Sequence, residues 1–211
     1  MAVRIISVAK QLPKFTRTTE EILPFLKVWL SGQEKRFQRK VVKLFENAGV
    51  ERRYSIMDAE DVFLNTSFEE KNVLYAKECT DLAEQALRKA LDKAKIDPVA
   101  LDYIITVSCT GIMIPSVDAY LINRLQLRQD IVRLPVTEMG CVVGVSGMIY
   151  ARNFLKANPE KRAAVIAVES PTSTFQLDDY SMANIVSAAI FGDGAAAVIL
   201  SSCREDRGPE I

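Results

Sequence analysis

The sequence predicts an α/β protein in which a mixed sheet carries helices on both faces. Short apolar runs rich in Val and Ile alternate along the 211 residues with longer stretches of helical periodicity. The runs are apolar at consecutive positions, as expected for strands that are buried on both sides. The chain is 49% hydrophobic and long enough to bury a core without disulfides or metals.

The predicted strands are the apolar runs 3–9, 103–108, 131–136, 163–169 and 195–201. The run at 131–136 has the weakest pattern. We therefore expect the sheet to centre on the other four, around Ile5, Ile104, Val165 and Val198.

The predicted helices are residues 18–30, 34–47, 73–95 and 148–157. In the third, apolar residues recur at three- and four-residue steps, and Cys79 lies on that stripe, so we expect it in the core. The second ends before Gly49, since glycine is the usual residue just beyond a helix. Residues 52–67 are polar and irregular and read as a long connection.

Composition excludes several classes of protein. Lys plus Arg and Asp plus Glu both number 27, which argues against a nucleic-acid protein that relies on bulk positive charge. No apolar run approaches the length of about 18 that predicts a membrane span. The four cysteines lie far apart without metal-ligand spacing, which indicates a reduced cytoplasmic protein and no metal site. The chain has no histidine, so no Ser-His-Asp triad or Cys-His pair forms within it.

The first candidate for chemistry is Cys141. An apolar strand ends, Gly140 allows a tight turn, and the cysteine begins a helix, where the free amides and the dipole favour a thiolate and could hold an oxyanion. The alternative is a small, inert cysteine beside Gly144 and Gly147, which keep the helix thin where it packs. Because Val142 to Ile149 leave little polar face, we expect the helix after Cys141 to be buried.

Two further segments place polar groups beside strands. The run from Ile105 carries hydroxyls and Cys109 to the carboxyl end of a strand, where open α/β sheets bind ligands. Residues 190–195 form a glycine turn in which Asp193 satisfies turn amides. Five basic residues lie within 35–43, as a solvated helix face or as a contact for substrate phosphates.

In this order, the segments resemble type III polyketide synthases, the chalcone and stilbene synthase family of thiolase-fold condensing enzymes. The motifs are Glu51-Arg-Arg-Tyr54, Val107-Ser-Cys-Thr-Gly111, Met113-Ile-Pro115, Gly140-Cys141, Glu169 to Phe175 and Phe191-Gly-Asp-Gly194. The amino-acid sequence of these motifs is closer to that of bacterial members of the family than to that of plant members. The resemblance implies the amino-terminal half of a thiolase-like layered fold over 1–202, with 203–211 starting a linker to an absent carboxy-terminal half.

The resemblance also implies a reaction. Cys141 would accept an acyl group from coenzyme A and be extended by decarboxylative condensation with malonyl-CoA, with coenzyme A thioesters as substrates and no further cofactor. In the family a His and an Asn support decarboxylation, and both lie in the second half of the fold. The 211 residues alone are therefore expected to be inactive in condensation. The family also implies a homodimer.

Four residues match pocket positions of the family. Cys109 and Thr174 match places that line the acyl pocket, and Phe191 matches the gatekeeping phenylalanine between the coenzyme A tunnel and the cavity. Ile114 matches the residue that reaches into the neighbouring subunit's cavity. Ordinary packing is the alternative for each.

Lys40 and Lys43 match basic positions near the coenzyme A phosphates. The third family position is Asn47 here, which weakens that contact. Ordinary surface charge is the alternative for the two lysines.

Two other functions stay open. One is a ketoacyl-carrier-protein synthase III-like condensing enzyme, which shares the fold and the nucleophile. The other is a non-catalytic assembly half that pairs with a second polypeptide. Either way, a half-fold without its duplicate should expose a broad apolar face.

Overall fold

The computed structural model describes residues 2–64 and 67–211. These residues form two compact units. Unit 1 holds the chain up to Gln11, Ala76–Glu169 and Ala195–Ile211; unit 2 holds the described part of Leu12–Tyr75 and Ser170–Gly194. Each unit is described by itself below.

Unit 1 is built on a five-stranded mixed sheet of order β1-β7-β6-β4-β5. Its strands are β1 (Arg4–Gln11), β4 (Tyr103–Val107), β5 (Val132–Val136), β6 (Arg162–Glu169) and β7 (Gly194–Ser201). β1 runs antiparallel to β7, whereas β4 runs parallel to both β5 and β6. The five predicted strands and the mixed sheet are thus confirmed, and the weakest run, β5, is one of the two edge strands.

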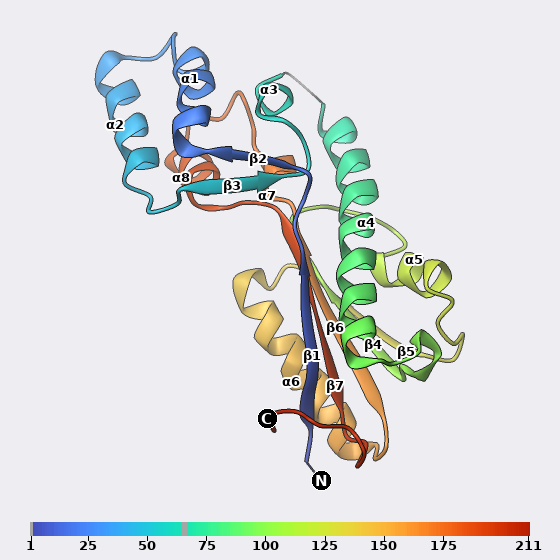
Figure 1. The fold of residues 1–211 in the computed structure, drawn as a ribbon. Helices are drawn as coiled ribbons and strands as arrows, with labels where there is room; N and C mark the ends of the chain where they lie inside the picture. The colour runs from blue at the N-terminus through green and yellow to red at the C-terminus, as the bar shows by residue number, and fades with distance from the viewer. Residues whose placement is uncertain (1, 65–66) are drawn as a thin grey trace. The chain divides into compact units, whose positions relative to one another are not determined.

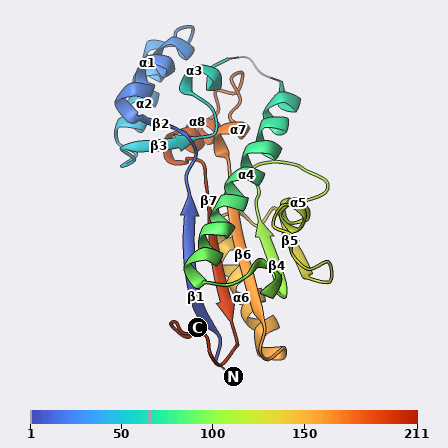
Figure 2. The same cartoon turned by 45° about the vertical axis from the view of Figure 1, so that its right-hand side comes forward.

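Helices cover both faces of this sheet. α4 (Phe68–Ala94) and α6 (Val143–Ala157) lie on opposite sides of it (Figure 1, Figure 2). α5 (Val117–Arg124) and a 3-10 turn at Pro98–Ala100 flank β4. Every residue of β4 is buried, and Cys79 of α4 is fully buried as predicted. No helix in the described part of the chain combines the length and apolarity that crossing a membrane requires.

α6 packs on the sheet along one narrow stripe. Its buried residues recur every four positions: Val143, Gly147, Ala151 and Leu155. A Cβ at Gly147 would lie 2.9 Å from Cγ1 of Val165, so this glycine allows the close approach of helix and sheet.

The expectation that α6 would be buried all round is wrong. Val142, Val145 and Ile149 are 56%, 55% and 49% exposed, because only one layer of this chain covers the helix. Gly144 also faces open space, so only Gly147 keeps the helix thin where it packs. The open side therefore presents these apolar side chains to solvent.

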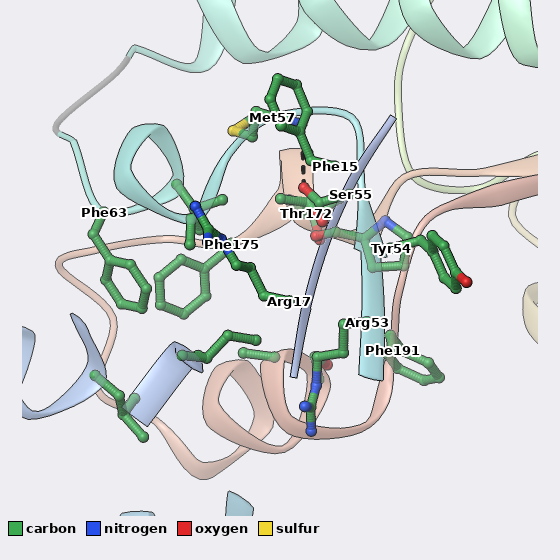
Figure 3. Close-up of a pocket in the computed structure, with 18 of the residues that line it drawn as sticks. Phe15, Arg17, Arg53, Tyr54, Ser55, Met57, Phe63, Thr172, Phe175 and Phe191 are labelled. Atoms are coloured by element: carbon green, nitrogen blue, oxygen red, sulfur yellow. Dashed lines mark hydrogen bonds between the residues drawn. The ribbon is translucent and has the colours of Figure 1, made fainter. Parts of the chain in front are cut away.

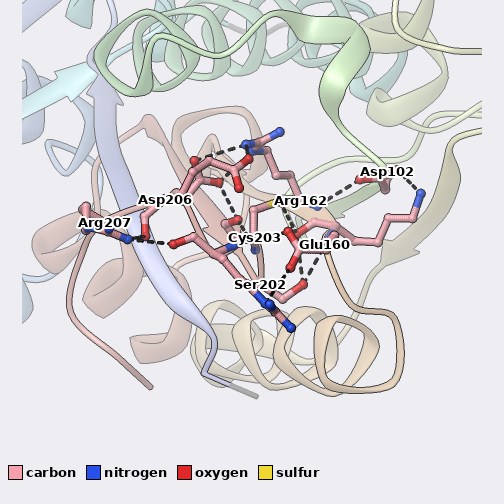
Figure 4. A network of polar contacts seen from close by, with 11 residues as sticks. Asp102, Glu160, Arg162, Ser202, Cys203, Asp206 and Arg207 are labelled. Atoms are coloured by element: carbon pink, nitrogen blue, oxygen red, sulfur yellow. Dashed lines mark hydrogen bonds and ion pairs between the residues drawn. The ribbon is translucent and has the colours of Figure 1, made fainter.

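The terminal segment 203–211 is fastened to unit 1. The Ile5 amide donates to the Pro209 carbonyl at 3.0 Å, and the Ile211 amide donates to the Val3 carbonyl at 2.9 Å. Arg162 bridges Glu205 and Asp206 at 2.9 and 2.8 Å (Figure 4).

Cys203, Glu205 and Asp206 offer ligand atoms within 4.8 Å of one another. Arg162 neutralises the two acids, and a hydrogen bond to Asp206 is the largest cause that raises the pKa of Arg162. This group is therefore an ion-pair network that holds the terminal segment, and it gives no ground for a metal site.

Unit 2 combines helices with a two-stranded antiparallel ribbon. The ribbon is β2 (Phe15–Thr18) with β3 (Arg52–Ser55), and the helices are α1 (Thr19–Trp29), α2 (Lys35–Glu46), α3 (Ala59–Val62), α7 (Pro171–Thr174) and α8 (Met182–Ile190). The core gathers six buried side chains, namely Leu26, Leu30, Val41, Phe45, Ile185 and Ala189.

The long irregular connection predicted at 52–67 is therefore wrong over half of its length. It contains β3 and α3; residues 65 and 66 lie outside the described part. Arg17 of β2 fixes this region, because its guanidinium makes hydrogen bonds of 2.9 and 3.2 Å to the two carboxylate oxygens of Asp58, which caps α3.

Candidate active site

Three parallel strands of unit 1 end at one edge of the sheet and bring the candidate chemistry together. β4 pairs with β6 through Val107 and Ala167 and with β5 through Val107 and Val136. Because parallel strands share a carboxyl edge, the residues that follow β4, β5 and β6 meet there. Those segments carry Cys109, Cys141 and Glu169.

Cys141 lies in a tight turn that leads into α6. Gly140 adopts φ +62°, a left-handed conformation that favours glycine, and Gly140–Val142 form one turn of 3-10 helix directly before Val143. The side chain is exposed and the thiol is free. The predicted glycine turn is confirmed, with the cysteine in this short turn and not in α6 itself.

Glu169, at the end of β6, collects the donors of the segment after β4. Its carboxylate accepts hydrogen bonds from the Cys109 amide at 3.0 Å and from the Thr110 hydroxyl at 2.6 Å. The pKa of Cys109 is raised to about 11, first by partial desolvation of its thiol and then by the charge and hydrogen bond of Glu169. The neighbouring Cys141 raises it further, whereas the Gly140 amide lowers it.

Sequence reasoning gave Glu169 no role of its own. The sequence does carry a sign of such a role, because Glu169 is an acid at the end of an otherwise apolar strand. The donors that bind Glu169 lie about 60 residues earlier in the chain. Only the register of β4 and β6 brings them together. Cys109 and Cys141 thus differ in their surroundings, because the Glu169 carboxylate lies beside Cys109 and raises the pKa of its thiol.

Ile114 projects from the same segment into solvent. It is 95% exposed, and Ile112 is 64% exposed. The segment after β4 thus carries two exposed aliphatic side chains.

A pocket in unit 2 contains the other two candidate substrate residues. It encloses about 810 Å³, part of it open to solvent, between the ribbon and the helices α1, α3, α7 and α8. Figure 3 shows its largely aromatic and apolar wall. Thr174 and Phe191 both line this pocket, so the structure brings them together in one cavity. Both are partly exposed, Phe191 by 42%.

Arg53 is the buried cation of this wall. It is only 8% exposed, donates to the Thr19 hydroxyl at 2.7 Å and to the Ala189 carbonyl near the end of α8, and lies over the Phe45 ring. Among the residues that the structure describes, its Nε finds no hydrogen-bond partner, and burial lowers the pKa of Arg53. The guanidinium therefore caps the carboxyl end of α8, where the helix dipole favours a cation.

Lys40 and Lys43 lie exposed on α2, whose opposite side buries Val41 and Phe45. Asn47 follows at the helix end and is also exposed. At these three positions the helix presents two cations and a neutral amide to solvent, beside the equally exposed Lys35, Arg36 and Arg39. A phosphate contact and a solvated face both fit this placement.

Comparison with known proteins identifies the family. Residues 2–203 match the profile of chalcone and stilbene synthases, N-terminal domain. The chain is 33% identical over 159 residues to a 1,3,6,8-tetrahydroxynaphthalene synthase of Streptomyces coelicolor, covering 75% of this chain and 42% of that protein. It is 31% identical over 208 residues to a putative chalcone synthase of Bacillus subtilis, covering 96% and 57%.

The fold agrees with this similarity. The crystal structure of 1,3,6,8-tetrahydroxynaphthalene synthase from Streptomyces coelicolor, a bacterial type III polyketide synthase, superposes with a TM-score of 0.90 at 29% identity. The superposition covers 97% of this chain and 58% of that one. The chain therefore has the fold of the amino-terminal half of a thiolase-like condensing enzyme. It belongs to the chalcone and stilbene synthase family and spans about half the length of the curated relatives it matches.

Proposed function

We propose that this chain supplies the nucleophile and part of the acyl pocket of a type III polyketide synthase. The Cys141 thiolate attacks the thioester carbonyl of an acyl-CoA, the bond to the coenzyme A sulfur breaks, and coenzyme A leaves as its thiol after taking up a proton. The observation that carries the proposal is the placement of Cys141: it is exposed and free on the glycine turn that enters α6.

Extension by malonyl-CoA needs more than this chain offers. Loss of carbon dioxide builds enolate charge on the thioester oxygen, and donors must be aimed at that oxygen. The family's His and Asn do this from the carboxy-terminal half, and the present sequence has no histidine. We therefore propose that condensation requires that half and that the 211 residues alone stop after acylation.

Two apolar features support assembly as part of this function. One is the open side of α6 with Val142, Val145 and Ile149, and the other is the bared Ile114. We propose that a carboxy-terminal half covers the first. For the second we propose a homodimer in which Ile114 enters the neighbouring subunit's cavity.

The test is acylation of the purified chain by hexanoyl-CoA, followed by intact-mass spectrometry and peptide mapping. A single acyl adduct on Cys141 is expected; Cys141→Ser should abolish it and the matched variant Cys109→Ser should retain it. An adduct on Cys109 instead, or polyketide release by the chain alone, would contradict the proposal. Absence of acylation together with tight self-association would favour the non-catalytic assembly half.

A further inference from the structure

Asp193 is a fully enclosed carboxylate inside unit 2. It is 4% exposed, and its two oxygens accept four hydrogen bonds. Oδ1 accepts from the Thr172 amide at 3.0 Å and the Thr172 hydroxyl at 2.8 Å; Oδ2 accepts from the Ile56 amide at 2.8 Å and the Ser170 hydroxyl at 3.1 Å. Within residues 2–64 and 67–211, no Lys or Arg forms an ion pair with it. Its partners are neutral donors.

These bonds join three segments that are distant in the sequence. The Ile56 amide belongs to the residue after β3, whereas Ser170 and Thr172 open α7. The Asp193 amide also donates to the Tyr54 carbonyl at 2.8 Å. Gly192 lies so close to the ribbon that a Cβ there would be 3.3 Å from the same carbonyl oxygen. The turn after α8 is thereby fixed against β3 and α7 at once.

Thr174 and Phe191, the two substrate candidates of the pocket, depend on this junction. Phe191 comes two residues before Asp193, and Thr174 ends the single helical turn that Thr172 helps to start. The Thr174 hydroxyl is itself turned back to the Pro171 carbonyl at 2.8 Å. A shift of either segment would move one wall of the pocket.

We propose that Asp193 is a positioning residue that holds Thr174 and Phe191 in place and so sets the shape of the acyl-binding pocket in unit 2. This proposal rests on the proposed function only for the identity of the ligand. Asp193 contacts the backbone and hydroxyls behind the wall; Thr174 and Phe191 contact the substrate.

The isosteric change Asp193→Asn separates this role from simple burial of a polar group. Each carboxylate oxygen accepts one backbone amide, from Thr172 or from Ile56. An asparagine has one oxygen and one NH2 group, so either orientation sets an N–H donor against a backbone N–H. Hydroxyls can rotate to become acceptors, but backbone amides cannot. One of the two backbone contacts is therefore lost in every orientation.

The matched control is Asp179→Asn in the same unit. Asp179 accepts from the Ser181 amide at 2.7 Å and from the Ser181 hydroxyl at 3.0 Å, on different oxygens. An asparagine there keeps the amide contact on its oxygen and donates its NH2 to the rotated hydroxyl. This variant should behave like the parent protein.

Trp29, the only tryptophan, reports the position of the segment after Thr174. Its ring lies 5.3 Å from that of Phe175 and 4.8 Å from that of Tyr180, and its Nε1 donates to the Leu177 carbonyl at 2.8 Å. Displacement of this segment should change the emission of the folded protein. Amide exchange at Ile56 and Thr172 reports the two bonds directly.

The experiment compares binding of S-octyl-CoA and S-ethyl-CoA, two stable thioethers, by calorimetry in the parent chain, Asp193→Asn and Asp179→Asn. We expect Asp193→Asn to reduce the preference for the octyl chain about tenfold, to shift Trp29 emission, and to speed amide exchange at Ile56 or Thr172. Asp179→Asn should change none of these. Where Asp193→Asn does not fold, Ser170→Ala, which removes one hydroxyl contact, takes its place with a smaller expected shift.

Each outcome of this experiment supports or overturns a stated part of the proposal. Unchanged emission, exchange and chain-length preference in folded Asp193→Asn would overturn the positioning role. If the parent chain binds neither thioether, the proposed function of the pocket fails, and the emission and exchange data still decide the role of Asp193. Altered emission and exchange with unchanged chain-length preference would also overturn the proposal, because Asp193 would then order the segment without shaping the pocket.

Discussion

Unit 1 and unit 2 bury their acidic side chains in opposite ways. In unit 1, Asp118 is fully buried against Arg133 at 2.5 Å, and Asp206 pairs with Arg162 at 2.8 Å. In unit 2, Asp193 is equally enclosed but meets only amides and hydroxyls. Burial raises the pKa of Asp193, and its four donors only partly offset that.

The contrast follows from how each unit obtains its core. Unit 1 has a sheet in which every residue of β4 is buried, so its framework is apolar, and its ion pairs lie around that framework. The four-residue strands of unit 2 are mostly polar, so a buried carboxylate and a buried guanidinium join its short segments. Disturbing apolar packing should therefore harm unit 1 most, and disturbing single hydrogen bonds should reshape unit 2 locally.

The largest expected effect comes from overpacking the interface of α6 and the sheet with Gly147→Leu. A Cβ at this position already lies 2.9 Å from Cγ1 of Val165, and side-chain carbons of Val107 and Ile105 follow at 3.5 and 3.7 Å. The free energy of unfolding should fall by about 3 kcal/mol, measured by urea denaturation. Gly144→Ala, on the open side of the same helix, should raise it by about 0.5 kcal/mol. Equal effects of the two changes would contradict the packing argument.

The same contrast explains how far the sequence could predict the fold. In unit 1 the apolar runs are enough by themselves to predict strands. The predicted bounds of β4, β6 and β7 agree with the observed bounds within a residue or so. β2 reads Phe-Thr-Arg-Thr and β3 reads Arg-Arg-Tyr-Ser, with no apolar alternation to mark them. They pair across about 35 residues of intervening chain, and Arg17 contacts Asp58 about 40 residues away.

The residues of the candidate site also differ in how far the local sequence predicts them. Cys141 could be predicted because a strand, a glycine and a thiol follow one another locally. Glu169 received no role from the sequence, and the expectation that Asp193 satisfies amides of its own turn is wrong. Both carboxylates accept hydrogen bonds from donors 20 to 140 residues away, which no local pattern reveals. The exposure of α6 was mispredicted because composition alone does not say how many layers cover a helix.

A second, smaller effect concerns the ion pairs of unit 1. The Asp102 side chain, 9% exposed, binds Lys161 at 2.9 Å, Arg128 at 3.2 Å and the Arg162 amide at 2.9 Å. Burial opposes ionisation, but these contacts together lower the pKa of Asp102. Asp102→Asn should cost on the order of 2 kcal/mol near neutral pH.

The sign of the pH dependence follows from that lowered pKa. The stabilisation by Asp102 is present above the unfolded-state pKa of about 3.9 and is lost as the pH falls through the folded-state pKa. Parent and Asp102→Asn should therefore differ in urea midpoint at pH 7 and converge as the pH falls below the lowered folded-state pKa. A constant difference across this range would show that the cost lies in packing and not in charge.

A third effect is chemical and leaves stability nearly unchanged. With a pKa of about 11, Cys109 is about one-thousandth thiolate at pH 8, so iodoacetamide should label it slowly. Glu169→Gln removes a charge and a hydrogen bond that raise this pKa, and labelling of Cys109 should accelerate severalfold. Mass spectrometry of the peptides measures the rate. Cys203, which is buried, serves as the control for unfolding, and equal rates in both proteins would remove Glu169 as a cause.

The smallest expected effect on stability belongs to the double change Lys40→Ala with Lys43→Ala. Both side chains are exposed on α2, so the free energy of unfolding should change by less than about 0.5 kcal/mol. If they contact the phosphates of coenzyme A, the affinity for coenzyme A should fall about tenfold, as loss of charged hydrogen bonds implies. Calorimetry with coenzyme A and with dephospho-coenzyme A measures both affinities.

The matched control is Lys27→Ala with Lys156→Ala, which removes the same charge from exposed positions of α1 and α6, outside the basic cluster 35–43. Charge that acts only at long range would weaken coenzyme A binding equally in both double variants, and raising the salt to 0.5 M would erase the difference from the parent. A true contact weakens binding only in the Lys40 and Lys43 variant and persists in part at high salt. Because Asn47 supplies no cation, adding Asn47→Lys to the parent should strengthen coenzyme A binding if the three positions form one phosphate site. The reason is that a cation four residues after Lys43 lies on the same side of the helix as Lys43. If Asn47→Lys binds coenzyme A no better than the parent, α2 is an ordinary solvated face.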